Sequence, residues 1–148
     1  MATPATTRGF TLIELLIALV LVAITSALAA SSYRNHLQRG YRVEAVHALL
    51  AVAAEQERFH LAHRTYSGRL DATPGDEPPG LPVASLTPHR HYRLLVEQAD
   101  AADFRVAAIA SAPDGSAGDP LCQRLVLDAT GRREARDATG RDTTARCW

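Results

Sequence analysis

Residues 8–34 read RGFTLIELLIALVLVAITSALAASSYR, and this stretch decides the fold. The 25 residues between Arg8 and Arg34 contain one charged side chain, that of Glu14. A helix needs roughly 20 predominantly apolar residues to cross the hydrocarbon core of a bilayer. The stretch therefore predicts a membrane-spanning helix over residues 10–32, preceded by a short leader, residues 1–9. The basic Arg8 predicts that the leader lies in the cytoplasm.

Glu14 is the unusual residue of this segment. An ionisable group near the start of a membrane helix costs a few kcal/mol, and it is usually retained for a partner or a function. Alternatively, Glu14 lies close enough to the lipid head groups for its carboxylate to stay hydrated. The order Gly-Phe-Thr-Leu-Ile-Glu at residues 9–14, opening a long apolar helix, closely resembles the N-terminal signature of the type IV pilins and of the related pseudopilins of type II secretion.

This resemblance implies a maturation route. In that family a prepilin peptidase cuts after the glycine, here Gly9, and methylates the new terminal amine, here that of Phe10. Glu14 would then pair with the terminal amine of a neighbouring subunit and dock it into a growing filament. Removing one partner of such a buried pair leaves an uncompensated charge, so the pair is suited to setting subunit register.

An ordinary secretory signal peptide is a competing interpretation of the same residues. Ala27-Leu28-Ala29 matches the A-x-A cleavage pattern, which would remove residues 1–29. The apolar segment after Glu14 already extends through Ala23, which is longer than most signal peptides need. A carboxylate near its start is also a handicap for a peptide that is discarded. We therefore favour the pilin interpretation.

The composition limits the number of domains. The chain has 148 residues, which is room for one domain, here residues 33–148. All 16 basic residues are arginines, and they balance 16 acidic residues, so the formal net charge is zero. A neutral chain gives no general reason to expect nucleic-acid binding.

The two cysteines, Cys122 and Cys147, lie near the C-terminus. An even pair in a chain with an export signal predicts a disulfide formed in an oxidising compartment. Such a bond stabilises a protein by roughly 3 kcal/mol in the chain-entropy model. In pilins a C-terminal disulfide bounds the D-region, here residues 122–147, and the ending Cys147-Trp148 is similar to that of small PilE-type minor pilins.

Residues 33–63 are amphipathic. Val46, Leu49, Leu50 and Ala53 recur at helical spacing, which predicts one buried face. A helix continuous from residue 11 to residue 63 is roughly 80 Å long at about 1.5 Å per residue. One small domain cannot enclose such a helix, so its first half must contact a bilayer or other copies of the chain.

The rest of the chain predicts a small sheet. Residues 67–89, rich in proline and glycine, predict an irregular αβ-loop exposed on the filament surface. Residues 91–98, 104–110 and 121–127 predict three antiparallel strands, and residues 133–136 a short edge strand. We expect an α+β type IV pilin fold, in which the sheet packs on the amphipathic half of the helix and a disulfide-bounded region follows.

The tail contains a short repeat and an excess of arginine. Asp-Ala-Thr-Gly-Arg occurs at residues 128–132 and again at 137–141, which predicts two similar turns. Arg132, Arg133 and Arg136 are candidates for contact with the phosphates of DNA, because arginine suits bidentate phosphate binding. The interspersed acidic residues favour an ordinary solvated surface instead.

The sequence contains no recognisable motif for catalysis or cofactor binding. His60 and His63 form one pair and His89 and His91 another, but nothing in the sequence brings four ligands together, so we predict no metal site. There is no phosphate-binding glycine loop, nucleophile elbow or catalytic carboxylate pair. We therefore predict a protein that is not an enzyme and has no cofactor.

These features together predict a structural subunit, most similar to a minor pilin, of a type IV pilus. Its expected location is the bacterial inner membrane, single-pass with a periplasmic C-terminal domain, and later the pilus on the cell surface. The implied partners are the prepilin peptidase, membrane lipid, the inner-membrane assembly platform and other pilins, through which the subunit supports adhesion or twitching motility. A type II secretion pseudopilin and a pilus-tip pilin that binds DNA or another ligand are the alternatives.

Overall fold

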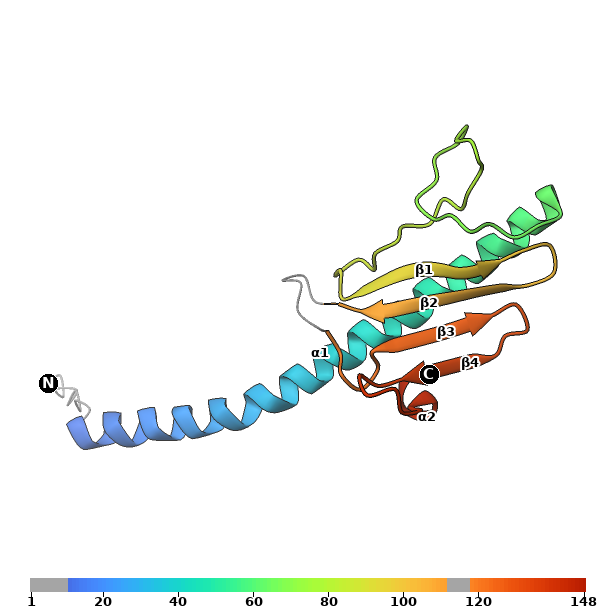
Figure 1. Ribbon diagram of the computed structural model, residues 1–148. Coiled ribbons are helices and arrows are strands. Elements are labelled where there is room, and N and C mark those ends of the chain that lie inside the picture. Colours follow the sequence, from blue (N-terminus) through green and yellow to red (C-terminus); the bar gives the residue numbers. More distant parts are fainter. Residues whose placement is uncertain (1–10, 112–117) are drawn as a thin grey trace, which may run out of the picture. The chain divides into compact units, whose positions relative to one another are not determined.

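The computed structural model describes residues 11–111 and 118–148. Its elements in chain order are α1 (Leu12–His63), β1 (Tyr92–Ala99), β2 (Phe104–Ala110), β3 (Arg124–Asp128), β4 (Arg133–Arg136) and α2 (Thr144–Cys147) (Figure 1). The chain divides into two compact units, the first ending at Leu37 and the second running from Gln38 to Trp148.

Helix α1 has a defined start and a defined end. At its start the Thr11 hydroxyl accepts a hydrogen bond from the Glu14 amide at 3.3 Å, which satisfies one of the free N–H groups of the first turn. At its end Arg64 adopts a left-handed conformation with φ of 60°, and its amide donates to the His60 carbonyl at 2.8 Å. This is the αL type of helix ending, built here without glycine. The continuous helix expected from the sequence is confirmed.

The first unit exposes its apolar side chains. The large aliphatic residues from Leu12 to Ile24 all have at least half of their surface accessible in the single chain. In the parts of the chain that the structure describes, no helix meets the combined length and hydropathy expected of a bilayer span. The transmembrane assignment of residues 10–32 therefore stays a prediction.

The four strands of the second unit form one antiparallel meander in the order β1-β2-β3-β4. Their register pairs Leu94 with Ala108, Val106 with Leu127, and Leu125 with Ala135. Paired residues point to the same face of a sheet, so these apolar positions gather on one side. The meander and the edge strand at residues 133–136 are confirmed.

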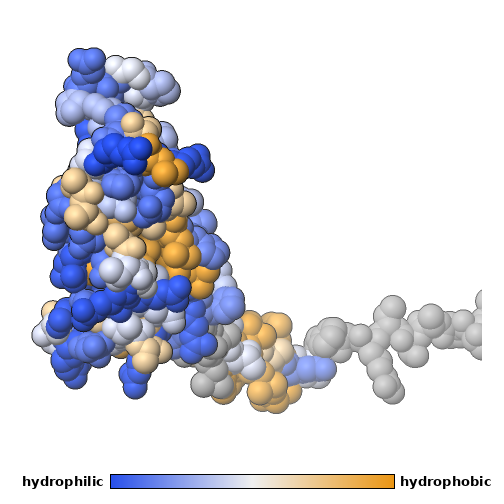
Figure 2. Space-filling view, turned by 90° about the vertical axis from the view of Figure 1, so that its right-hand side faces the viewer, coloured by the Kyte–Doolittle hydropathy of each residue, from blue (hydrophilic) through white to orange (hydrophobic). Residues whose placement is uncertain are grey.

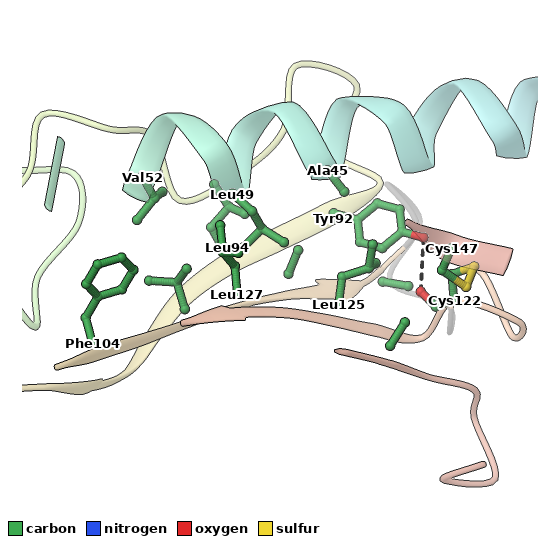
Figure 3. Close-up of a cluster of buried hydrophobic side chains, with 14 of the residues drawn as sticks. Ala45, Leu49, Val52, Tyr92, Leu94, Phe104, Cys122, Leu125, Leu127 and Cys147 are labelled. Carbon is green, nitrogen blue, oxygen red and sulfur yellow. Dashed lines mark hydrogen bonds between the residues drawn. A yellow bond between two sulfur atoms is a disulfide. The ribbon is translucent and has the colours of Figure 1, made fainter. Parts of the chain in front are cut away.

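The sheet packs on the part of α1 that belongs to the second unit, and the hydrophobic core lies between them (Figure 3). Three helix residues, Ala45, Leu49 and Val52, belong to this core. Their spacings of four and three residues place them on one face of the helix. The largest fully buried apolar side chains are aromatic or aliphatic and come from the helix, the loop and the strands: Leu49, Val52, Leu81, Tyr92, Phe104, Val106 and Leu125.

The buried face of the helix agrees in part with the predicted one. Leu49 is fully buried, and Val46 and Ala53 are partly buried against the core, whereas Leu50 is 42% exposed and was predicted wrongly. The other fully buried residues of this face are Ala45, Val52 and Gln56. Gln56 belongs to the buried face because its amide is satisfied: Nε2 donates to the Ser67 carbonyl at 2.7 Å, and Oε1 accepts from the Ser67 amide at 2.8 Å.

The αβ-loop is irregular, as predicted, but parts of it are anchored. Most of its residues are exposed, whereas Ser67, Ala72, Leu81 and Thr87 are buried. Backbone hydrogen bonds from Ala72 to Leu81 and from Leu81 to Arg69 close the loop on itself. The loop is therefore irregular in its backbone but packs against the core through Leu70, Leu81 and Val83.

Hydrophilic side chains cover most of the face drawn in Figure 2, and smaller apolar patches lie between them. In the second unit the exposed large apolar residues include Val43, Leu50 and Leu61. Singly exposed apolar residues are normal on protein surfaces, so exposure alone assigns no function to any of them.

Candidate functional site

Of the residues predicted to direct maturation and docking, Gly9 and Phe10 lie outside the described residues. Glu14 occupies the first turn of α1, where its side chain is exposed. Thr11 and Glu14 stand in the Thr-x-x-Glu order of a capping box, and the bond from the Glu14 amide to Thr11 Oγ1 is one half of that motif. A carboxylate in the first turn also complements the helix dipole. The Thr-x-x-Glu pattern is visible in the sequence and indicates this capping bond at the start of α1.

A buried ion pair joins α1 to the segment before β3. The Arg42 guanidinium contacts both oxygens of Asp119, through Nε to Oδ2 and through Nη2 to Oδ1 at 3.0 Å. The two side chains are only 14% and 6% exposed. The Tyr92 hydroxyl donates to the Cys122 carbonyl at 3.0 Å (Figure 3) and lies 3.3 Å from Asp119 Oδ2. The two partners are 77 residues apart, so no local sequence pattern reveals this pair.

Asp119 also shapes the turn that leads to the disulfide. Its Oδ1 accepts hydrogen bonds from the amides of Leu121 at 3.0 Å and Cys122 at 3.2 Å. Burial by itself raises the pKa of Asp119, but the hydrogen bond and charge of Arg42, together with these amides, outweigh it and hold the pKa below its usual value. Burial, followed by the charge of Asp119, raises the pKa of Tyr92. Asp119 is therefore ionised and Tyr92 neutral at physiological pH.

The same hydrogen bonds explain why the third strand is shorter than predicted. We expected it to begin at Leu121, but β3 begins at Arg124. The amides of Leu121 and Cys122 donate to Asp119 and are not available to a neighbouring strand. The hydrophobic pattern of residues 121–127 does not reveal this competition.

Cys122 and Cys147 form a disulfide with a Cα–Cα distance of 5.8 Å, which confirms the C-terminal disulfide of the expected fold. Both residues are buried. The loop that the bond closes contains β3, β4 and the short helix α2, which was not among the predicted elements. The bond therefore fixes the C-terminal region against the sheet.

The sequence repeat of the tail is a structural repeat. Asp128 Oδ1 accepts hydrogen bonds from the Thr130 amide and hydroxyl and from the Arg132 amide at 3.0, 2.6 and 3.0 Å. Asp137 Oδ1 makes the equivalent three bonds to Thr139 and Arg141 at 2.8, 2.7 and 3.0 Å. The two similar turns predicted from the sequence are confirmed, and they lie at opposite ends of β4.

The glycine of each turn has positive φ, 80° at Gly131 and 83° at Gly140. Glycine adopts this conformation without steric cost. The Thr139 hydroxyl is the main cause of the lowered pKa of Asp137, and it outweighs the effect of burial there with help from the amides of Arg141 and Thr139. Both turns are thus held by an ionised aspartate.

Arg132, Arg133 and Arg136 line one hollow of about 240 Å³ at the edge of the sheet. Glu134 and Asp142 line it as well, so three positive charges face two negative ones. Arg132 Nε lies 3.3 Å from Glu134 Oε1, whereas no ion pair between described residues includes Arg133 or Arg136. The structure brings the three predicted arginines together, with a net positive charge.

Arg133 is also held in place from the C-terminus. Its guanidinium carbon lies 5.4 Å from the centre of the Trp148 ring, within range of a cation–π interaction. Trp148 Nε1 in turn donates to the Glu134 carbonyl at 2.9 Å. Contacts with Trp148 thus position Arg133, while Arg132 pairs with Glu134 and Arg136 Nη1 donates to the Gly140 carbonyl at 3.0 Å.

The histidines are engaged in separate aromatic contacts. His60 stacks on Tyr66 and His63 on Phe59, while His91 stacks on Tyr41 with a centroid distance of 3.6 Å. His89 Nδ1 lies 2.5 Å from Glu44 Oε1. Across the described ranges, no three metal-ligating side chains gather closely enough to hold an ion.

Comparison with known proteins identifies two family models. Residues 5–30 match the prokaryotic N-terminal methylation motif. Residues 31–126, more than half of the chain, match the model described as type IV minor pilin ComP, DNA uptake sequence receptor. The chain matches no curated protein. The long N-terminal helix, the antiparallel four-stranded sheet and the C-terminal disulfide agree with both matches. The chain is therefore a type IV pilin that belongs to the ComP family of minor pilins.

Proposed function

We propose that this minor pilin is cut between Gly9 and Phe10, methylated on the Phe10 amine and held in the inner membrane by residues 10–32 until it joins a pilus. The match to the methylation motif supports this route. The exposed aliphatic side chains from Leu12 to Ile24 support it as well, because a helix that is apolar on every side needs lipid or other helices around it. The second unit is then periplasmic before assembly and exposed on the pilus afterwards.

Glu14 is the proposed docking residue of this assembly. It is the only charged residue between Arg8 and Arg34, and its side chain is exposed and takes part in no ion pair between the residues that the structure describes. The ammonium of a neighbouring Phe10 would compensate this charge in an apolar bundle. The assembly platform, the peptidase and other pilins are the corresponding partners, and the role of the subunit is structural.

Replacing Gly9 by leucine tests the maturation step. We expect the variant to remain as an uncut precursor in the membrane fraction, because the peptidase acts at the bond after this glycine. Intact-mass measurement reports the result, since wild type begins with a methylated Phe10. Gly40→Ala is the matched control: no atom lies within 4 Å of the added Cβ, and its processing should be normal. A Gly9→Leu protein that matures normally, or a wild-type chain that begins at Ala30, contradicts the proposal.

DNA binding is the second candidate function. The matched family is described as a receptor for a DNA uptake sequence, and the hollow formed by Arg132, Arg133 and Arg136 offers three guanidinium groups for phosphate contact. These arginines lie just beyond the matched residues, so their role is proposed from the geometry of this chain. Glu134 and Asp142 limit the attraction to a few phosphates.

The salt dependence of binding tests this function. For the full chain in detergent and a short DNA duplex, each lost phosphate contact should reduce the slope of log K against log salt by about 0.9. We expect R132Q/R133Q/R136Q to flatten the slope by about two to three. The triple variant R64Q/R90Q/R93Q removes the same charge from other exposed positions and should keep the wild-type slope. Equal slopes for wild type and R132Q/R133Q/R136Q would exclude this hollow, and wild type without salt-dependent binding would exclude the function.

A further inference from the structure

A second hollow, of about 530 Å³, lies between α1 and the C-terminal residues of the second unit. Pockets that hold small molecules usually have volumes of about 300–1,000 Å³. The lining combines apolar side chains, one aromatic ring and arginines, and the residues that matter here are Val43, Val46, Leu121, Trp148, Arg39 and Arg146. All of them belong to the second unit, and the DNA contact proposed above uses none of them.

Two arginines of this hollow carry positive charge that the described parts of the chain do not neutralise. Arg42 also lines the hollow, but Asp119 compensates its charge. Arg39 and Arg146 are exposed, and neither takes part in an ion pair between the residues that the structure describes. A ligand suited to the hollow therefore carries an anionic group for these arginines.

Trp148 supplies a fixed aromatic surface in the same hollow. Its indole N–H donates to the Glu134 carbonyl at 2.9 Å, and its ring packs partly against the core, while part of the residue stays accessible. A ring that is already held in place loses little conformational freedom when a flat partner stacks on it. Proteins that bind single-stranded nucleic acid combine a positively charged groove with aromatic side chains of this kind, on which the bases stack.

The Trp148 ring also connects this hollow with the arginine hollow proposed for DNA. The Arg133 guanidinium lies over that ring, 5.4 Å from its centre, and Arg133 lines the other hollow together with Arg132 and Arg136. The two groups are thus close enough to contact one nucleotide, its phosphate at Arg133 and its base at Trp148. A base inside a duplex reaches such a ring only after it is unpaired and unstacked, which costs free energy.

We propose that the two hollows together bind single-stranded DNA. The arginines at both hollows contact phosphates, and an unpaired base stacks on Trp148 beside the apolar side chains of Val43 and Val46. The inference rests on the DNA binding proposed above and names the form of DNA that the site prefers. Duplex DNA contacts the arginine hollow alone and leaves Trp148 without a partner.

The contribution of the base is measured by removing bases while keeping phosphates. The full chain in detergent is titrated with a short single strand and with a strand of equal length built from abasic sites, and fluorescence anisotropy of the labelled strands gives both affinities. We expect the strand with bases to bind about 5- to 150-fold more tightly than the abasic strand. It should also quench Trp148, which is the only tryptophan in the chain.

Two variants of Trp148 assign this preference to the ring. W148L should make the two affinities equal, whereas W148F keeps an aromatic ring and should retain most of the preference. If Trp148 served only to position Arg133, W148L would weaken both strands by the same factor and leave their ratio unchanged. That result would overturn the stacking contact.

The arginines of the second hollow are tested through salt. For the single strand, R39Q/R146Q should reduce the slope of log K against log salt by about 1.4, at about 0.7 for each lost phosphate contact. The slope for a duplex of the same sequence should stay as in wild type. The control R64Q/R93Q removes two exposed arginines that do not line the hollow, and both slopes should be unchanged.

The outcomes separate this inference from the DNA binding on which it rests. Equal wild-type affinities for the two strands, or a single-strand slope that R39Q/R146Q does not change, overturn the inference. Salt-dependent binding of the duplex in the same experiment leaves the proposed DNA function intact. A wild-type chain that binds neither single strands nor duplex overturns both.

Discussion

Replacing Asp119 by alanine is expected to destabilise the second unit by about 3–5 kcal/mol, because removal of one member of a buried ion pair leaves the other charge uncompensated. Arg42 would keep its charge in a site where it is 14% exposed. The amides of Leu121 and Cys122 would lose their acceptor as well. Chemical denaturation of the full chain in detergent, followed by near-ultraviolet circular dichroism, measures the change in the free energy of unfolding.

Asp100→Ala is the matched control for this variant. Asp100 Oδ1 likewise accepts two amide hydrogen bonds, from Ala102 at 2.7 Å and Asp103 at 2.9 Å, but the residue is exposed and has no arginine partner in the described chain. Its replacement should cost only about 1 kcal/mol, the typical value for a lost cap. If both variants lose the same free energy of unfolding, the Arg42–Asp119 pair contributes no stability beyond that of the hydrogen-bonded turn.

The pH dependence of the Asp119 contribution follows from the direction of its pKa. Because the folded state holds the pKa of Asp119 below its usual value, the stabilisation is present above the unfolded pKa of about 4 and is lost as the pH falls further. The difference in stability between wild type and Asp119→Ala should therefore be constant near neutral pH and shrink below about pH 4. A difference that grows on acidification contradicts an ionised Asp119.

Replacing both Cys122 and Cys147 by alanine is the second change with a large expected effect. Removal of a native disulfide from a small exported domain typically costs about 2–5 kcal/mol. The bond closes a loop with a sequence separation of 25 residues, which includes β3, β4 and α2. For a chain of this size we expect the melting temperature to fall by roughly 5–20 °C, as measured by circular dichroism.

Reduction separates the effect of the bond from that of the altered side chains. Dithiothreitol should lower the melting temperature of wild type towards that of the double variant and should leave the double variant unchanged. The same double variant should retain processing after Gly9, because that site belongs to the other end of the chain. If the melting temperature of the double variant equals that of oxidised wild type within error, the disulfide does not stabilise the region.

The sequence predicted the long helix, the order of the strands and the disulfide from local signals. Apolar length, alternation along residues 104–110 and an even cysteine pair each depend on a few neighbouring residues. The paired turns were also predictable, since each Asp-Ala-Thr-Gly-Arg segment carries its own acceptor, donors and glycine. The capping bond from the Glu14 amide to Thr11 belongs to the same class, because Thr-x-x-Glu is a pattern of four neighbouring residues.

Contacts between distant segments were not predictable in this way. The buried face of α1 could be assigned only in part by apolarity, because Gln56 becomes a core residue only when Ser67 satisfies its amide. The pairing of Arg42 with Asp119 and the shortening of β3 depend on the same kind of distant partner.

The sequence by itself thus determined that this chain is a pilin with a helix too apolar and too long for its own domain. Only the tertiary structure decided which arginines gather at one hollow, which are neutralised and which remain available, because charge compensation depends on spatial neighbours that sequence distance does not reveal.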